Sequence, residues 1–239
     1  MIIDRDLKKI IKMEREKEKA RLRINLKHIQ AGVSFLDWRT AYIDESVTIG
    51  DGTVIGSNVR IEGNTIIGCG CIIGNNSRIV SSRIDNDADI QYSIIIESKV
   101  GKRTKVGPFA YLRPNCNIGQ DVRIGDFVEI KNSNIGDGSK APHLAYIGDA
   151  DVGGNVNLGC GVVFVNYDGF EKARSTVGDQ AFVGCNVNLI APVKVGDGAY
   201  VAAGTTITKD VPEGALCVGR IRTSNIEGWV ARRRLMKNR

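Results

Sequence analysis

The stretch IDESVTIGDGTVIGSNVRIEGNTIIGCGCIIGNNSRI, residues 43–79, repeats one pattern without interruption. An isoleucine returns at every sixth position, and Gly or a small polar residue usually follows it. Because six is an even number, the recurring side chains share one face of an extended chain, while Gly, Asn and Asp supply the bends. The stretch therefore predicts a short strand and a turn in each repeat, and its period excludes a helix.

The aliphatic series covers most of the chain, with occasional slips of one residue. It breaks after Leu158 and resumes at Val177. Its members after residue 79 are Ile84, Ile90, Ile95, Val100, Val106, Leu112, Ile118, Ile124, Ile130, Ile135, Ala141, Ile147, Val152, Leu158, Val177, Val183, Leu189, Val195, Val201 and Ile207. Three strands would close a coil of about eighteen residues, and stacked coils would bury this ladder in a narrow prism. We therefore expect an all-β parallel β-helix, and the usual rule for parallel crossovers would make its coils right-handed.

The residues before the repeat have a different pattern. From residue 4 to about residue 30, apolar Leu7, Ile10 and Ile11 stand among Lys, Arg and Glu, which predicts a charged amphipathic helix. Such a helix either caps the first coil or forms an arm that docks on another subunit or domain. We divide the chain into a helix or arm (1–32), a β-helix domain (33–218) with an extruded loop near 160–176, and a C-terminal segment with a basic tail (219–239), expected to be disordered from Ala231 to Arg239.

The composition of the 239 residues narrows the class of protein. No apolar run approaches the roughly 20 residues needed to span a bilayer, and the charged start of the chain does not resemble a secretory signal, so we expect a cytoplasmic protein without a membrane partner. The net charge of +6 favours anionic partners without indicating nucleic acid. The six cysteines include no CxxC pair, which indicates neither a zinc site nor a disulfide framework; they are Cys69, Cys71, Cys116, Cys160, Cys185 and Cys217.

Two cations follow equivalent positions of the ladder. Arg113 comes after Leu112 and Lys131 comes after Ile130, eighteen residues or one coil later. Neighbouring strands lie roughly 4.8 Å apart, so the two like charges would repel each other unless an anion lies beside them. The pair predicts a phosphate site, although both side chains could instead extend separately into water.

One of only two histidines lies at a second irregular place. His143 comes two residues after ladder position Ala141, and Cys160 occupies the matching place one coil further on. A lone histidine is often a hydrogen-bonded structural residue, but its neutral form can also accept a proton near pH 7.

A third irregularity is the interval between Leu158 and Val177. It includes the segment VNYDGFEK, residues 165–172. Asp-Gly is a common turn pair, so this segment could be turn chemistry alone. A loop that leaves a rigid wall just after His143 and Cys160 would also roof a cleft.

Six stretches together carry a resemblance to one family. They are residues 107–114 (GPFAYLRP), 125–131 (GDFVEIK), 140–149 (KAPHLAYIGD), 166–169 (NYDG), 202–206 (AAGTT) and 227–229 (EGW). Over residues 25 to 235, the sequence resembles the C-terminal acetyltransferase domain of the bifunctional N-acetylglucosamine-1-phosphate uridyltransferase/glucosamine-1-phosphate acetyltransferases, a hexapeptide-repeat acyltransferase family. The resemblance implies left-handed coils and a homotrimer with active sites between subunits.

The resemblance also implies roles for individual residues. His143 matches the catalytic base, which would take a proton from the sugar amine as that amine attacks acetyl-CoA directly. The residues implied in binding the sugar phosphate are Arg113, Lys131, Tyr146, Asn157, Asn166, Tyr167 and Lys172. Those implied in contacting acetyl-CoA are Cys160, through its backbone N–H, with Cys185, Ala203, Arg220 and Trp229. The chain departs from the usual family residues at Pro142, Ala145, Cys160 and Cys185.

The expected reaction is therefore acetyl transfer from acetyl-CoA to glucosamine-1-phosphate, without a metal, in the synthesis of UDP-N-acetylglucosamine for the cell wall. Residues 1–40 contain no Gly-rich nucleotide-binding loop, so no uridyltransferase activity is expected in this chain and a separate uridyltransferase is a possible partner. The alternatives are an acetyltransferase for another amino sugar or a non-catalytic trimeric scaffold. A γ-class carbonic anhydrase needs three histidine ligands, and the sequence has two.

Overall fold

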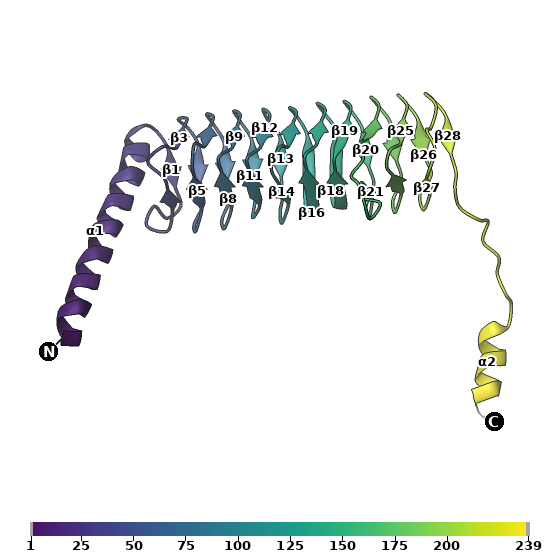
Figure 1. Cartoon of the computed structure of the whole chain (residues 1–239), viewed down its shortest axis with the longest axis horizontal. Helices are drawn as coiled ribbons and strands as arrows, with labels where there is room; N and C mark the ends of the chain where they lie inside the picture. Colours follow the sequence, from purple (N-terminus) through teal and green to yellow (C-terminus); the bar gives the residue numbers. More distant parts are fainter. Residues whose placement is uncertain (1, 238–239) are drawn as a thin grey trace.

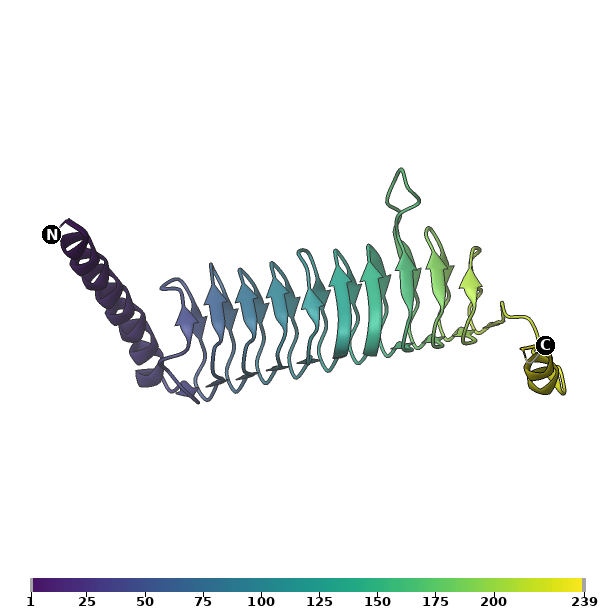
Figure 2. The same ribbon diagram turned by 90° about the horizontal axis from the view of Figure 1, so that it is seen from below.

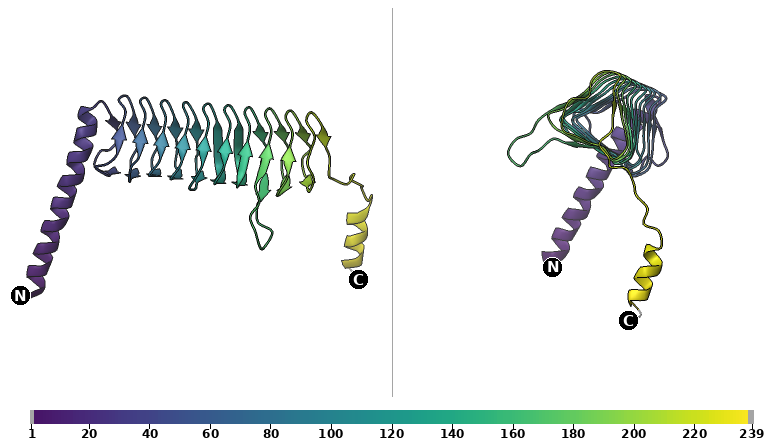
Figure 3. Two further views of the ribbon diagram at one scale, coloured as in Figure 1. Left: turned by 45° about the horizontal axis from the view of Figure 1, so that its top comes forward. Right: turned by 90° about the vertical axis from the view of Figure 1, so that its right-hand side faces the viewer.

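A computed structural model describes residues 2–237, so the ends of the predicted arm and tail, Met1, Asn238 and Arg239, lie outside the described residues. Between helix α1 (Ile2–Gln30) and helix α2 (Trp229–Lys237), short parallel strands wind into one solenoid (Figure 1). Figure 3 shows that its coils are roughly triangular when viewed along the axis. The architecture is a left-handed parallel β-helix with an N-terminal helix, which confirms the expected fold.

Each side of the triangle is a wall of stacked strands. The first wall contains β1 (Ser34–Phe35), β4 (Val54–Ile55), β7 (Ile72–Ile73), β10 (Asp89–Ile90), β13 (Lys105–Val106), β16 (Arg123–Lys131), β18 (Lys140–Gly148), β20 (Asn157–Leu158), β23 (Phe182–Val183), β26 (Tyr200–Val201) and β28 (Leu216–Cys217). The second wall contains β2 (Tyr42–Ile43), β5 (Arg60–Glu62), β8 (Arg78–Val80), β11 (Ile94–Ile96), β14 (Tyr111–Leu112), the ends of β16 and β18, β21 (Val163–Val165), β24 (Asn188–Ile190) and β27 (Thr206–Ile207). The third wall contains β3 (Thr48–Ile49), β6 (Ile66–Ile67), β9 (Arg83–Ile84), β12 (Lys99–Val100), β15 (Asn117–Ile118), β17 (Asn134–Ile135), β19 (Ala150–Val152), β22 (Ser175–Val177) and β25 (Lys194–Val195).

The predicted ladder forms the core of the prism. All of its members from Ile43 to Ile207 are buried, none more than 8% exposed. Neighbouring coils keep the ladder in register, as where Leu112 pairs with Ile130 between β14 and β16. Hydrophobic burial along this thin axis, together with main-chain hydrogen bonds between coils, holds the solenoid together.

The break in the ladder is shorter than the sequence indicated. Phe164 on β21 is fully buried, six residues after Leu158, and pairs with Leu189 of the next coil. The prediction that the ladder stops at Leu158 is therefore wrong, because an aromatic residue occupies a position that was sought only among aliphatic residues. The irregular segment is confined to residues 166–174, between β21 and β22. It projects from the prism as a loop (Figure 2).

The N-terminal helix both caps the prism and extends beyond it. Asn25 is fully buried and donates through its Nδ2 to the carbonyl oxygens of Trp38 and Ala41. The guanidinium of Arg21 lies over the Tyr42 ring, 4.5 Å from its centroid. Most side chains from residue 6 to residue 20 are exposed, and this half of α1 leans away from the first coil (Figure 1).

The other end of the chain differs from the expected disordered tail. Residues 229–237 form α2, which has no buried residue. Neither α1 nor α2, the helices found in residues 2–237, is long and apolar enough to cross a membrane. In the same part of the chain, all six cysteines are free and no group of three or more His, Cys, Asp or Glu side chains could hold a metal ion.

Candidate functional site

Two long strands mark the functional region. Elsewhere the strands contain two or three residues, but β16 and β18 contain nine each and run around the corner between the first and second walls. They pair throughout, and Asp126 lies opposite His143. A side chain at Gly125 would collide with the Pro142 carbonyl oxygen, so only glycine permits this close stacking. The corner turns at Phe127 and Leu144, which both have positive φ.

His143 is paired with a carboxylate that the sequence analysis missed. Its Nδ1 lies 2.8 Å from Oδ1 of Asp126, and the two side chains are 54% and 41% exposed. The hydrogen bond from His143, followed by the backbone amide of Asp126, lowers the pKa of the Asp126 carboxyl. The signal was present, because Asp126 precedes His143 by one coil at the same place in the repeat.

The predicted acetyl-CoA residues continue the same column. Asn157 pairs with Lys140, and Leu158 pairs with Val183, so this register brings His143, Cys160 and Cys185 to equivalent places on successive coils. The turns after them are joined by main-chain hydrogen bonds. Gly161 donates to the Leu144 oxygen (2.7 Å), Asn186 to the Cys160 oxygen (2.8 Å) and Gly204 to the Cys185 oxygen (2.8 Å). Ala203 is next in the column, and Nη1 of Arg220 donates to its carbonyl oxygen (3.1 Å).

The backbone N–H of Cys160 lacks the hydrogen-bond acceptor that the equivalent N–H has in a regular coil. Ser57 occupies the equivalent place near the N-terminal end, and its N–H donates to Oδ1 of Asn75 one coil further on (2.7 Å). On the coil after Cys160, the place equivalent to Asn75 is taken by Cys185, whose side chain has no amide oxygen. Within residues 2–237, the Cys160 N–H has no protein acceptor. It is therefore available to a ligand.

The predicted phosphate residues gather at the next corner, between the second and third walls. Arg113 stacks on Lys131, as the eighteen-residue spacing predicted, but Nη1 of Arg113 pairs with Oε1 of Glu129 (2.8 Å). Lys131 instead lies beside Lys172 of the loop, and a hydrogen bond with Lys172 followed by the charge of that residue lowers the pKa of Lys131. In the described part of the chain, neither lysine forms an ion pair within 4.0 Å. Two neighbouring cations without a paired carboxylate favour an anionic ligand.

The base of the loop is anchored by two carboxylates. Asp149, 9% exposed, accepts hydrogen bonds from the side-chain amides of Asn132 and Asn166. Desolvation raises the pKa of Asp149, but the two amides and then the charges of Lys131 and Lys172 outweigh it, so the pKa lies below its usual value. On the other side of the loop, Arg174 pairs with Asp151 and donates to the Asn132 and Ala150 oxygens (2.8 and 2.9 Å).

The tip of the loop is a tight turn. Tyr167 and Lys172 form an antiparallel bridge, and the Tyr167 hydroxyl donates to the Gly169 oxygen (2.7 Å). The Asp168 carboxylate accepts from the backbone N–H groups of Phe170 (2.8 Å) and Glu171 (2.7 Å). Turn chemistry therefore shapes the tip and brings Lys172 back towards the wall.

The predicted site residues thus form two groups. His143, Cys160, Cys185, Ala203 and Arg220 lie along the first corner, and Asn157 lies on the first wall beside them. Arg113, Lys131, Asn166, Tyr167 and Lys172 lie at the second corner. Tyr146 is on the second wall between the groups, and its hydroxyl reaches over Gly148 towards the Asn166 amide. Trp229 begins α2, is 54% exposed, and makes no hydrogen bond or ring contact with either group in the described residues.

The span between the two groups is set by the strand. From His143 to Gly148, which pairs with Lys131, β18 advances five residues, so its path is at most roughly 16 Å and is shortened by the corner at Leu144. Side chains of His143 and Lys131 both shorten this span. Tyr146 lies between the two groups on the same strand.

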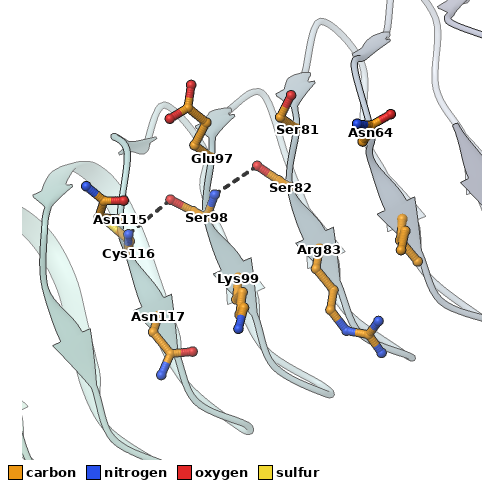
Figure 4. A pocket seen from close by; sticks show the side chains of 11 residues that line it. Asn64, Ser81, Ser82, Arg83, Glu97, Ser98, Lys99, Asn115, Cys116 and Asn117 are labelled. Carbon is orange, nitrogen blue, oxygen red and sulfur yellow. Dashed lines mark hydrogen bonds between the residues drawn. The ribbon is translucent and has the colours of Figure 1, made fainter. Parts of the chain in front are cut away.

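A depression without any predicted site residue lies elsewhere on the solenoid. A groove of about 500 Å³ crosses four coils nearer the N-terminus, at the corner between the second and third walls (Figure 4). The Ser82 hydroxyl accepts from the Ser98 amide (3.1 Å) and the Ser98 hydroxyl from the Cys116 amide (3.3 Å). These polar groups satisfy one another, and no predicted site residue lines the groove.

Comparison with known proteins agrees with this architecture. The family model described as "Bacterial transferase hexapeptide (six repeats)" matches residues 46–81, 97–132 and 174–209. A UDP-N-acetylglucosamine acyltransferase of Francisella novicida has a similar structure, with a TM-score of 0.56 and 19% identity over 82% of this chain and 72% of that chain. This likeness shows the fold alone. The repeat and the solenoid together define a hexapeptide-repeat protein of the bacterial transferase type.

Sequence relatives narrow the class. The bifunctional protein GlmU of Clostridium beijerinckii is 52% identical over 215 residues, and that of Caldicellulosiruptor saccharolyticus is 54% identical over 219 residues. These alignments cover 90% and 92% of this chain but 47% of each relative, so the chain spans about half the length of the curated relatives it matches. At 52–54% identity over some 90% of its length, the chain corresponds to the C-terminal, repeat-bearing part of these proteins.

Proposed function

We propose that the chain transfers the acetyl group of acetyl-CoA to the amine of glucosamine-1-phosphate, giving N-acetylglucosamine-1-phosphate and coenzyme A. The observation that carries this proposal is that a possible proton acceptor and a possible phosphate site lie on adjacent corners of the prism. A histidine that can accept a proton lies at one corner, and two unpaired lysines that favour a phosphate lie at the next. Tyr146 lies on the second wall between them.

The proposed mechanism is direct transfer. The C2 amine of the sugar attacks the thioester carbonyl carbon while the free ring nitrogen of neutral His143 removes a proton from the amine. The carbonyl oxygen becomes an oxyanion, to which the Cys160 N–H donates. The C–S bond then breaks, coenzyme A leaves as a thiolate, and the imidazolium proton can pass to it. No covalent bond to the protein forms, so the Cys160 thiol itself takes no part.

The phosphate and the cofactor occupy opposite ends of this arrangement. Lys131 and Lys172 bind the sugar phosphate, with Arg113 beside them held by Glu129. Asn166 and Tyr146 lie near this end and supply hydrogen bonds to the sugar. Acetyl-CoA extends along the first corner past Cys185 and Ala203 to Arg220, whose guanidinium suits a phosphate of coenzyme A.

We propose further that the active molecule is a homotrimer with sites between subunits. On one chain the His143 side chain is 54% exposed, and no wall of the same chain faces the first corner. A neighbouring prism would cover this corner and exclude water from the thioester. The six free cysteines suit a reducing compartment, so we place the reaction in the cytoplasm. A uridyltransferase is the class of enzyme that would consume the product.

The test is acceptor-dependent release of free thiol from acetyl-CoA, compared for glucosamine-1-phosphate, glucosamine-6-phosphate, glucosamine and serine. We expect glucosamine-1-phosphate to give the highest kcat/KM and the acceptors without a phosphate the lowest, because Lys131 and Lys172 favour an anionic group. Higher activity with another acceptor would redirect the assignment to a different amino-compound acetyltransferase. Absence of thiol release and of acetyl-CoA binding would favour a scaffold.

A further inference from the structure

The backbone register of β16 and β18 brings the side chains of Asp126 and His143 into contact. Gly125 admits the Pro142 carbonyl of the next coil, and the two turns at Phe127 and Leu144 share the left-handed conformation. The residues just before these turns are therefore superposed on successive coils, with their side chains 2.8 Å apart. Proline at 142 also fixes φ immediately before His143. Most surface ion pairs depend on two mobile side chains and contribute little, but here both main chains are held in register.

We propose that Asp126 is the positioning residue of the catalytic base, a role that rests on the function proposed above. The carboxylate accepts the Nδ1–H of the imidazole and so leaves Nε2 unprotonated. It also fixes the ring plane, so that Nε2 faces the path of the attacking amine. When Nε2 takes the proton, the imidazolium forms beside a negative charge. Asp126 does not touch the substrate and acts only through His143.

The charges around the pair support this role. The carboxyl of Asp126 has a lowered pKa through its hydrogen bond with His143, so Asp126 is ionised throughout the neutral range. Arg123, on the same strand, adds to this lowering. The other titratable groups near the imidazole are Lys140 on β18 and the Cys160 thiol on the next coil. The second carboxylate of β16, Glu129, is occupied by Arg113 and is unavailable to His143.

The test compares Asp126→Ala, Asp126→Asn and the control Asp121→Asn. Asp121 lies on the neighbouring corner, pairs with Arg103 and makes no contact with the proposed site. We expect Asp126→Ala to lower kcat by roughly 10-fold or more, but by no more than the 10²–10⁴-fold that general-base catalysis contributes, with KM for both substrates changed by less than about 2-fold. Asp126→Asn should fall between the wild type and Asp126→Ala, because an amide oxygen can accept the Nδ1 proton without a charge. Asp121→Asn should match the wild type.

A second readout does not depend on activity. The chain has only His28 and His143, so ¹⁵N spectra of its imidazoles can be assigned with the single variant His143→Ala. We expect His143 in the wild type to carry its proton on Nδ1, and Asp126→Ala to move that proton towards Nε2, while His28 stays unchanged. If the wild type acetylates no amino sugar but shows this shift, the proposed function fails and the pairing stands. If Asp126→Ala changes neither kcat nor the tautomer, the positioning role is overturned.

Discussion

Two clusters of cations on the second wall show how the molecule treats charge in its regular and irregular coils. Near the N-terminal end, Glu62 lies between Arg60 and Arg78, with its oxygens 3.0 and 2.6 Å from their guanidinium nitrogens. Further along, Lys131 and Lys172 face each other, and the nearby Asp149 is occupied by two asparagine amides. In the first cluster a carboxylate neutralises the two arginines, whereas in the second cluster neither lysine forms an ion pair within the described residues. Ligand binding is therefore expected only in the second case.

The first prediction concerns the proton acceptor. His143→Ala should lower kcat for acetyl transfer to glucosamine-1-phosphate by roughly 10²- to 10⁴-fold, because it removes the proposed acceptor of the amine proton. Thiol release measures the effect. His28→Ala, on α1, is the matched control and should retain wild-type activity. A loss shared equally by both variants would mean that His143 is not the base.

The second prediction separates the two cation clusters directly. Lys131→Ala should raise KM for glucosamine-1-phosphate by about 10-fold or more, since it removes a charged donor to the phosphate. Arg78→Ala removes a cation of the same wall that Glu62 already neutralises, and KM should not change. Initial rates at varied acceptor concentration measure both. Equal effects from the two variants would remove the distinction between regular and irregular coils.

The third prediction concerns the anchor of the loop. Asp149→Asn replaces a carboxylate that accepts two amide hydrogen bonds, at a positive φ of 51° that asparagine tolerates. We expect the anchor to weaken by about 1–3 kcal/mol. Chymotrypsin should then cut faster near Tyr167 and Phe170, and KM for the sugar phosphate should rise. Asp85→Asn, at an exposed pair with Arg83, should leave both unchanged. Wild-type cleavage in Asp149→Asn would show that Arg174 alone holds the loop.

The smallest effect is expected in the neutralised cluster. The hydrogen bond from Arg78 lowers the pKa of Glu62 below its unfolded value of about 4.3. A lowered folded pKa stabilises the protein above the unfolded pKa, and this contribution disappears as pH falls through the folded value. Glu62→Gln should therefore cost up to about 1 kcal/mol at pH 7, and nothing once the carboxyl is protonated. Denaturation at pH 7 and pH 3 measures the difference, and a cost that persists at pH 3 would exclude charge as its origin.

Much of the fold follows from the sequence, because one six-residue period determines strand, turn and buried face together. The ladder from Ile43 to Ile207 is buried as expected. Phe164 was not predicted as a member of the ladder, because its aromatic ring fills a place that aliphatic side chains fill elsewhere. The helix at residues 229–237 also escaped, because no core contact specifies it.

The site was less accessible to sequence reasoning. Spacing alone predicts that Arg113 stacks on Lys131 and that His143 lies below Cys160, because the residues of each pair are one coil apart. It did not reveal that Glu129 pairs with Arg113 or that the loop brings Lys172 beside Lys131. These contacts depend on side-chain rotamers and on the course of the loop. Asp126 could have been found from the same one-coil spacing, had the column been followed below His143 as well as above it.

The central claim is that an acetyl group is transferred at the irregular coils to the amine of a sugar whose phosphate is bound at the next corner. Its most direct test is to supply acetyl-CoA labelled with ¹³C at the acetyl carbonyl, together with glucosamine-1-phosphate, and to follow the label by NMR. We predict an amide carbonyl signal of N-acetylglucosamine-1-phosphate, formed in the same amount as free coenzyme A and absent with His143→Ala. Label that appears in acetate or in an ester, or that stays in acetyl-CoA, would contradict the account.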